Sequence, residues 1–137
     1  MANPPFSKGD DGFGYRREVL KGSTKFLADN AVVFLNISYQ YGHKRIEDLY
    51  KNNVNFKYEG VIATTDWIPF DLKNEHLLNC LKTYVIEEEK GGFKYTFFVK
   101  DSNSKYLTAQ KTFEYFNDTG KNPLTKWQTH MFKFKKR

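Results

Sequence analysis

Short runs in which hydrophobic and polar residues alternate recur along this chain, and a period of two is typical of half-buried β-strands. The clearest runs are Phe26–Tyr41, Val54–Trp67 and Lys126–Lys135, which are rich in β-branched and aromatic residues. A shorter run, Arg16–Leu20, precedes a Gly-Ser-Thr turn at 22–24. The pattern therefore predicts at least four strands joined by polar turns.

A β-hairpin is expected in the middle of the chain. Thr83–Ile86 and Phe93–Val99 are two apolar runs, and the Lys-Gly-Gly sequence at 90–92 supplies residues that tolerate a tight turn between them. The second run places its aromatic side chains on one face by alternation: Phe93, Tyr95 and Phe97.

Two segments have the spacing of short helices. Apolar residues in 44–52 fall three to four positions apart, and the asparagines at 52 and 53 are expected to end that helix. Asp71 and Asn74 are alternative N-caps for a second helix, which ends at Cys80 or Leu81. Residues 105–116 fit both an alternating strand and a helix that begins at Ser104, so the pattern leaves this segment open.

These elements predict an α+β, β-rich single domain with six or seven mostly antiparallel strands and two short helices. We expect it to span 15–137, to end in a basic aromatic strand, and to follow an extended arm at 1–14, where Asn-Pro-Pro disfavours helix and central strand. The segment Lys105–Ala109, followed by Trp127, resembles one repeat of a fascin-like β-trefoil. That resemblance implies an all-β trefoil as the alternative fold and a carbohydrate- or protein-binding module as an alternative function.

Composition narrows the class of protein. Of the 137 residues, 39% are hydrophobic, which is enough for a core without crosslinks. No run approaches the roughly 18 apolar residues of a membrane span, and the first residues lack an apolar signal segment, so we expect a cytoplasmic protein or a component of a particle. Cys80 is the only cysteine, which excludes an intramolecular disulfide and a Cys-based zinc site. We expect no metal and no cofactor.

The net charge of +6 is placed unevenly along the chain. Residues 105–137 carry eight basic side chains against two acidic ones, whereas residues 1–104 carry 14 of each. Aromatic residues lie among these lysines, and cations that pair with phosphates beside rings that stack on bases are the ingredients of single-strand binding. We therefore predict a non-enzymatic protein that binds single-stranded nucleic acid or another polyanion. The expected contact residues are Lys126, Trp127, Lys133, Lys135, Lys136 and Arg137, with Lys94 and Tyr95 from the predicted hairpin.

Alternation divides the final strand into two faces. Trp127 and Lys133 share a face that becomes cationic towards the end of the strand, whereas Phe132 and Phe134 share the other. We therefore expect the Trp127 face to be exposed and the Phe132 face to be buried.

Patterns of catalytic residues are weak. Asp71, Glu88 and Lys90 follow the order of the D…(D/E)-x-K motif of metal-dependent nucleases, but Glu88 and Lys90 fall at the predicted hairpin turn. His76 and Cys80, four residues apart, are the other pair of interest, because a histidine can activate a thiol. We expect no enzyme. The main alternative is a structural protein that assembles, as a homo-oligomer or in a larger complex, through its aromatic surface and Pro-containing arm.

Overall fold

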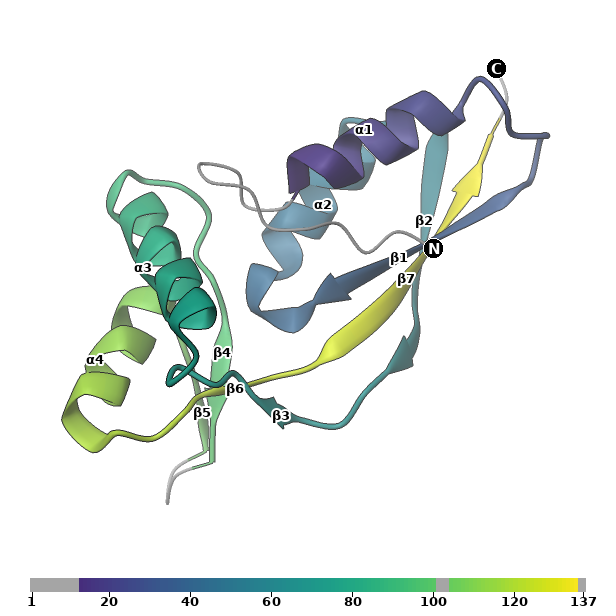
Figure 1. The fold of residues 1–137 in the computed structure, drawn as a ribbon. Helices are drawn as coiled ribbons and strands as arrows, with labels where there is room; N and C mark the ends of the chain where they lie inside the picture. The colour runs from purple at the N-terminus through teal and green to yellow at the C-terminus, as the bar shows by residue number, and fades with distance from the viewer. Residues whose placement is uncertain (1–12, 101–103, 136–137) are drawn as a thin grey trace. The chain divides into compact units, whose positions relative to one another are not determined.

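The computed structural model describes residues 13–100 and 104–135, and it confirms the mixed α+β class (Figure 1). These residues form seven strands in two antiparallel sheets, together with four α-helices. Their contacts divide them into two compact units. Unit 1 comprises the described parts of Met1–Ile37 and Trp127–Arg137 with His43–Thr65, and unit 2 comprises Ser38–Gly42 with the described parts of Asp66–Lys126. The single domain over 15–137 stays a prediction, and the arm expected at 1–14 lies outside the described residues except for its last two.

Unit 1 has two helices and a three-stranded sheet. Its elements are α1 (Phe13–Ser23), β1 (Val32–Ser38), α2 (His43–Lys51), β2 (Phe56–Thr64) and β7 (Trp127–Phe134). The strand order β1-β7-β2 places β7 at the centre of the sheet (Figure 1). Phe132 and Phe134 are buried while Trp127 is exposed, so the predicted assignment of the two faces of this strand is confirmed.

The segment Arg16–Leu20, predicted as a strand, lies in α1, so that prediction was wrong. Its two buried residues, Arg16 and Leu20, are four positions apart, which is the spacing of one helix face. The Arg16 guanidinium Nη2 donates to the carbonyl oxygen of Asn36 on β1 at 2.9 Å. A charged residue on the buried face thus masks the helical period in the pattern of hydrophobic residues.

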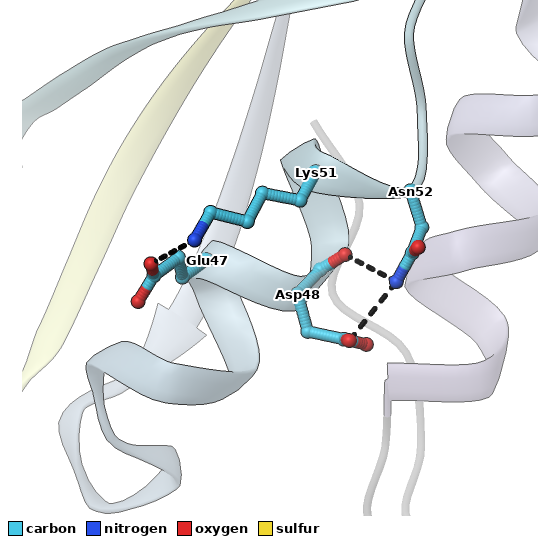
Figure 2. A network of polar contacts seen from close by, with 4 residues as sticks. All are labelled: Glu47, Asp48, Lys51 and Asn52. Atoms are coloured by element: carbon cyan, nitrogen blue, oxygen red, sulfur yellow. Dashed lines mark hydrogen bonds and ion pairs between the residues drawn. The ribbon is translucent and has the colours of Figure 1, made fainter.

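α2 confirms the helix predicted over 44–52, which ends where the asparagines begin. The side-chain amide of Asn52 donates to both the carbonyl oxygen and the carboxylate Oδ1 of Asp48, each at 2.9 Å (Figure 2). The same carbonyl oxygen also accepts the backbone N–H of Asn52 at 3.1 Å, so the side chain adds a second hydrogen bond at the end of the helix. Lys51 pairs with Glu47 one turn earlier on the same helix (Figure 2).

Unit 2 combines two helices with a four-stranded antiparallel sheet. Its elements are the 3₁₀ turn η1 (Tyr39–Tyr41), β3 (Ile68–Pro69), α3 (Glu75–Glu89), β4 (Phe97–Val99), β5 (Lys105–Leu107), α4 (Ala109–Thr119) and β6 (Leu124–Thr125). The strand order is β3-β6-β4-β5. Phe97 of β4 is fully buried and its ring centroid lies 6.4 Å from that of Tyr84 on α3, so α3 covers this face of the sheet.

α3 extends through the first strand of the predicted β-hairpin, so the hairpin prediction was wrong. Leu81, Tyr84 and Glu88 are buried at three- and four-residue spacing, which is the period of a helix face. The glycines that suggested a hairpin turn end α3 instead. Gly91 has a φ of +86° and donates its N–H to the carbonyl oxygen of Glu88 at 3.0 Å. Of the second predicted strand, 97–99 forms β4.

Side-chain caps fix the start of both helices in unit 2. The Asn74 carbonyl oxygen Oδ1 accepts the backbone N–H of His76 at 2.9 Å, so this predicted N-cap is confirmed. The Thr108 hydroxyl accepts the N–H of Lys111 at 3.2 Å and starts α4. The ambiguous segment 105–116 therefore divides into a short strand and a helix. Four α-helices exclude the all-β trefoil as the fold of the described chain.

Candidate functional site

The residues expected to bind nucleic acid are divided between the two units. In unit 1 lie Trp127, Lys133 and Lys135; in unit 2 lie Lys94, Tyr95 and Lys126. Lys136 and Arg137 lie outside the described residues. Each unit therefore has to be considered as a candidate surface of its own.

In unit 1, the exposed side of β7 brings a second lysine beside Lys133. The strand register sets Lys57 of β2 directly opposite Lys133, and we call these two residues the lysine pair. The next pairs on the same side are Gly60 with Met131 and Ala63 with Thr129. These pairs contain no carboxylate, but Glu59 is exposed in the bulge between Tyr58 and Gly60 and is the nearest acidic residue of β2. Because like charges directly opposite one another destabilise a sheet, an anion bound between the lysines would relieve a repulsion that the fold contains.

We call this side of the sheet, opposite Phe132, the open face of unit 1. Trp127 lies on it, six residues from Lys133, which corresponds to about 20 Å along a strand. The indole is 37% exposed. Lys135 follows β7, and its ammonium donates to the oxygen of the neutral Asn30 side-chain amide at 3.0 Å. The open face therefore has a cationic end and an aromatic end.

Sequence reasoning missed Lys57, although a local signal was present. The residues on either side of it, Phe56 and Tyr58, are buried and half-buried. Alternation along the strand therefore predicts that Lys57 points to the opposite, exposed side. Its position opposite Lys133, however, depends on the register between strands more than 70 residues apart in sequence. The charge of the C-terminal segment is thus only part of the cationic surface.

The excess positive charge, which the sequence places in residues 105–137, belongs to only one of the two units of the structure. By sequence, unit 1 carries 13 basic and seven acidic residues, whereas unit 2 carries nine of each. The net +6 therefore belongs to unit 1, and long-range attraction of a polyanion would be directed there.

Tyr95 is a core residue of unit 2. It is 1% exposed, its ring stacks on that of Tyr84 with centroids 3.9 Å apart, and its hydroxyl donates to the carboxylate of Glu87. This burial is incompatible with the base-stacking role expected of Tyr95, and it arises because 83–89 is a helix that packs against the residue. Lys94 beside it is exposed.

Four aromatic rings of unit 2 gather beside Lys126. Trp67 stacks on Phe98 of β4 with centroids 4.6 Å apart, and Tyr39 of η1 meets the edge of Trp67 at 5.2 Å. Tyr106 of β5 lies 5.2 Å from Phe98. The ammonium of Lys126 lies 4.4 Å from the centroid of Trp67 and 5.1 Å from that of Tyr39. We call these five residues the aromatic cluster; sequence reasoning had included only Lys126.

Glu88, the central carboxylate of the nuclease-like pattern, is used inside the fold. It is 4% exposed, and its two oxygens accept three backbone N–H groups at 2.8–3.0 Å, those of Tyr95, Ala109 and Gln110. Two of these donors belong to the first turn of α4, whose N–H groups have no partner within the helix. The carboxylate therefore acts as a structural acceptor.

The other residues with catalytic potential are similarly engaged. The Asp71 carboxylate accepts the backbone N–H of Lys73 at 3.1 Å. The Cys80 sulfur lies 3.9 Å from Nε2 of His76, and burial raises the pKa of the thiol, which disfavours a nucleophilic thiolate. Within 13–100 and 104–135, no group of three His, Cys, Asp or Glu side chains is placed to hold a metal ion.

A buried histidine lies on the core side of β7. His130 is 1% exposed, and its Nδ1 shares a hydrogen bond of 2.8 Å with the Tyr58 hydroxyl. Its Nε2 has no hydrogen-bond partner among the residues that the structure describes. Burial, followed by the positive charges of His43 and Arg16, lowers the pKa of His130 to about 4. The folded protein therefore holds this imidazole neutral.

Unit 1 should lose stability in mild acid because of His130. Below about pH 6.5 the unfolded chain binds a proton at this residue, whereas the folded chain does not bind one until about pH 4. The free energy of unfolding therefore decreases as the pH is lowered through this window. From about pH 7 to about pH 5 the expected loss is about 2 kcal/mol, measured by urea unfolding. His130→Gln should abolish most of this dependence, whereas His76→Gln, at an exposed position, should retain it. An unchanged pH dependence in His130→Gln would assign the effect to other groups.

Comparison with known proteins finds no family model and no curated sequence that matches this chain. Among the described residues, no helix is long and apolar enough to cross a membrane. The open face of unit 1 and the aromatic cluster of unit 2 are therefore the two candidate binding surfaces.

Proposed function

We propose that the protein binds single-stranded nucleic acid through the open face of unit 1. The observation that carries this proposal is the lysine pair, two lysines that the strand register sets opposite each other, with Glu59 outside the register pairs in the neighbouring bulge. Cross-strand neighbours have Cβ atoms about 4.5–5.5 Å apart, which lets both ammonium groups reach one phosphate or two adjacent ones. Binding of the backbone would offset the repulsion between them.

The features of this face favour a single strand over a duplex. Single-strand sites combine a cationic track for the phosphates with aromatic side chains on which unpaired bases stack. Lys57, Lys133 and Lys135 supply the first feature, and the partly exposed indole of Trp127 supplies the second. A strand that runs along β7 would meet both.

Salt dependence of oligonucleotide binding tests this proposal. If five cations, these three lysines with Lys136 and Arg137, each release a counterion from a single strand, log K should fall against log salt with a slope of about −3.5. Neutralising the lysine pair, Lys57→Gln with Lys133→Gln, should reduce the slope to about −2 and weaken binding at ~50 mM salt. Fluorescence anisotropy of a labelled oligonucleotide measures both quantities.

A matched control removes two exposed lysines from the helices of unit 2. Lys82→Gln with Lys111→Gln changes the net charge by the same amount, and it should leave the slope near that of the unmodified protein. Equal effects of the two double variants would reduce the proposal to nonspecific attraction by net charge. An oligonucleotide affinity that does not depend on salt concentration, or no binding at low salt, would refute the proposal.

Self-association through β2 is a second candidate function. β2 is an edge strand of the unit 1 sheet, and its Val61 and Ile62 are 44% and 52% exposed. Unpaired strand edges with apolar side chains are templates for pairing with another chain. Size-exclusion chromatography with and without oligonucleotide separates the two functions, since an oligomer that forms without nucleic acid favours assembly.

A further inference from the structure

The sheet of unit 2 has a face that its helices do not cover. Phe97 and Val99 of β4 are buried towards α3, so Phe98 between them points to the opposite side. The register sets Phe98 opposite both Tyr106 of β5 and Leu124 of β6. The aromatic cluster is therefore the uncovered face of this sheet.

Within the cluster, the ring of Tyr106 is exposed to solvent and the other three rings pack around it. Tyr106 is 57% exposed, whereas Trp67, Phe98 and Tyr39 are half-buried. Tyr106 contacts all three, with centroid separations of 5.2 Å to Phe98, 6.2 Å to Tyr39 and 6.4 Å to Trp67. Burial, and after it the Tyr106 hydroxyl, raise the pKa of Tyr39, which keeps it neutral. Tyr106 is thus an exposed aromatic ring that its neighbours hold in place.

The charges of the cluster select the kind of ligand. Lys126 already places an ammonium over Trp67 and Tyr39, so a cationic ligand would meet like charge there. Lys126 has no carboxylate partner among the described residues. The side chains that share this face by register or alternation include no acid: Trp67, Pro69, Phe98, Tyr106, Leu124 and Lys126. A planar ligand that carries negative charge is therefore the one that this surface complements.

We propose that the aromatic cluster is a second nucleic-acid contact, in which an unpaired base stacks on Tyr106 and Lys126 pairs with the adjoining phosphate. This inference rests on the proposed function and adds a second place, besides Trp127, at which an unpaired base stacks. Stacking on an aromatic ring tolerates any base, because every base has a π-face, so the contact is expected to be insensitive to sequence.

An oligonucleotide with its bases removed isolates this contact. The probes are a labelled oligodeoxythymidylate and an abasic strand with the same number of phosphates, each titrated with the full chain. Tyr106→Ala should weaken binding of the thymidylate about 5- to 150-fold, the effect of losing one stacked base, and leave binding of the abasic strand unchanged. Neutralising the lysine pair should weaken binding of both strands alike.

Two further variants are controls that separate loss of the stacked base from damage to the fold. Tyr106→Phe keeps the ring and should bind the thymidylate as the unmodified protein does. Phe93→Ala removes another exposed ring of unit 2, at 45% exposure, and should have no effect. Thymidylate binding that Tyr106→Ala leaves unchanged, or a loss shared by the abasic strand, would overturn the inference while the proposed function stands. Absence of all oligonucleotide binding by the unmodified protein would overturn both.

Discussion

Phe132→Ala is expected to lower the free energy of unfolding by about 3–5 kcal/mol, the range for truncating a large buried ring. Phe132 is fully buried on the central strand of unit 1. Its ring lies 5.4 Å from that of Tyr58, its register partner on β2. Because β1 and β2 both pair with β7, the cavity would open in the middle of the sheet, where neighbours on two sides lose contact. Urea or thermal unfolding followed by circular dichroism measures the loss.

Trp127→Ala on the same strand is the matched control for this change. The indole is 37% exposed, so its removal should cost about 1 kcal/mol or less, while it should weaken single-strand binding by about 1–3 kcal/mol if the ring stacks on a base. A protein that unfolds on Trp127→Ala but tolerates Phe132→Ala would reverse the assignment of the two faces.

Glu88→Ala is expected to cost about 4 kcal/mol of stability. The change leaves two buried backbone N–H groups and the partly buried N–H of Gln110 without their acceptor, and each buried loss costs roughly 1–3 kcal/mol. It also removes a negative charge from the first turn of α4, where the helix dipole favours one. Glu88→Gln should cost less, about 2 kcal/mol, since the amide oxygen can still accept while the amide nitrogen faces a donor.

Glu89 provides the comparison for Glu88, because it is exposed at the end of the same helix. Glu89→Ala should change stability by no more than about 0.5 kcal/mol, as surface substitutions usually do. Denaturation of the three variants side by side tests the ranking. Equal stabilities of Glu88→Ala and Glu89→Ala would mean that water replaces the carboxylate without loss.

Sequence pattern predicted the elements in which apolar residues mark most of the buried face, although Arg45 of α2 and His130 of β7 are buried as well. β1, β2, β7 and α2 were all found within or close to the expected ranges, and the exposed and buried faces of β7 were assigned correctly. α1 and the second half of α3 were not, because Arg16 and Glu88 occupy buried helix positions. Each of the two side chains makes hydrogen bonds to the backbone of a distant segment, and no local period records such a partner.

The candidate surfaces were predictable only in part, because they too depend on contacts between residues that are far apart in the sequence. The cationic character of β7 is visible in sequence, but Lys57 joins Lys133 through register alone. Tyr39, Trp67, Phe98 and Tyr106 come from separate places along the chain and meet only when the sheet of unit 2 and η1 are formed. The clear alternation around Tyr95 marked a segment that enters the core of unit 2 ahead of β4, and not a binding surface.

The order of strands in unit 1 has a consequence for how the chain emerges from the ribosome. Tyr58 and His130, which share a hydrogen bond, are 72 residues apart, so at about 5–20 residues per second β2 waits roughly 4–14 s for its partner. Throughout that interval β1 and β2 lack β7, the strand that pairs with both of them, while the four strands of unit 2, between Ile68 and Thr125, are synthesised. A nascent chain halted before Trp127 would therefore expose two unpaired strands to chaperones and proteases until β7 is synthesised and pairs with both.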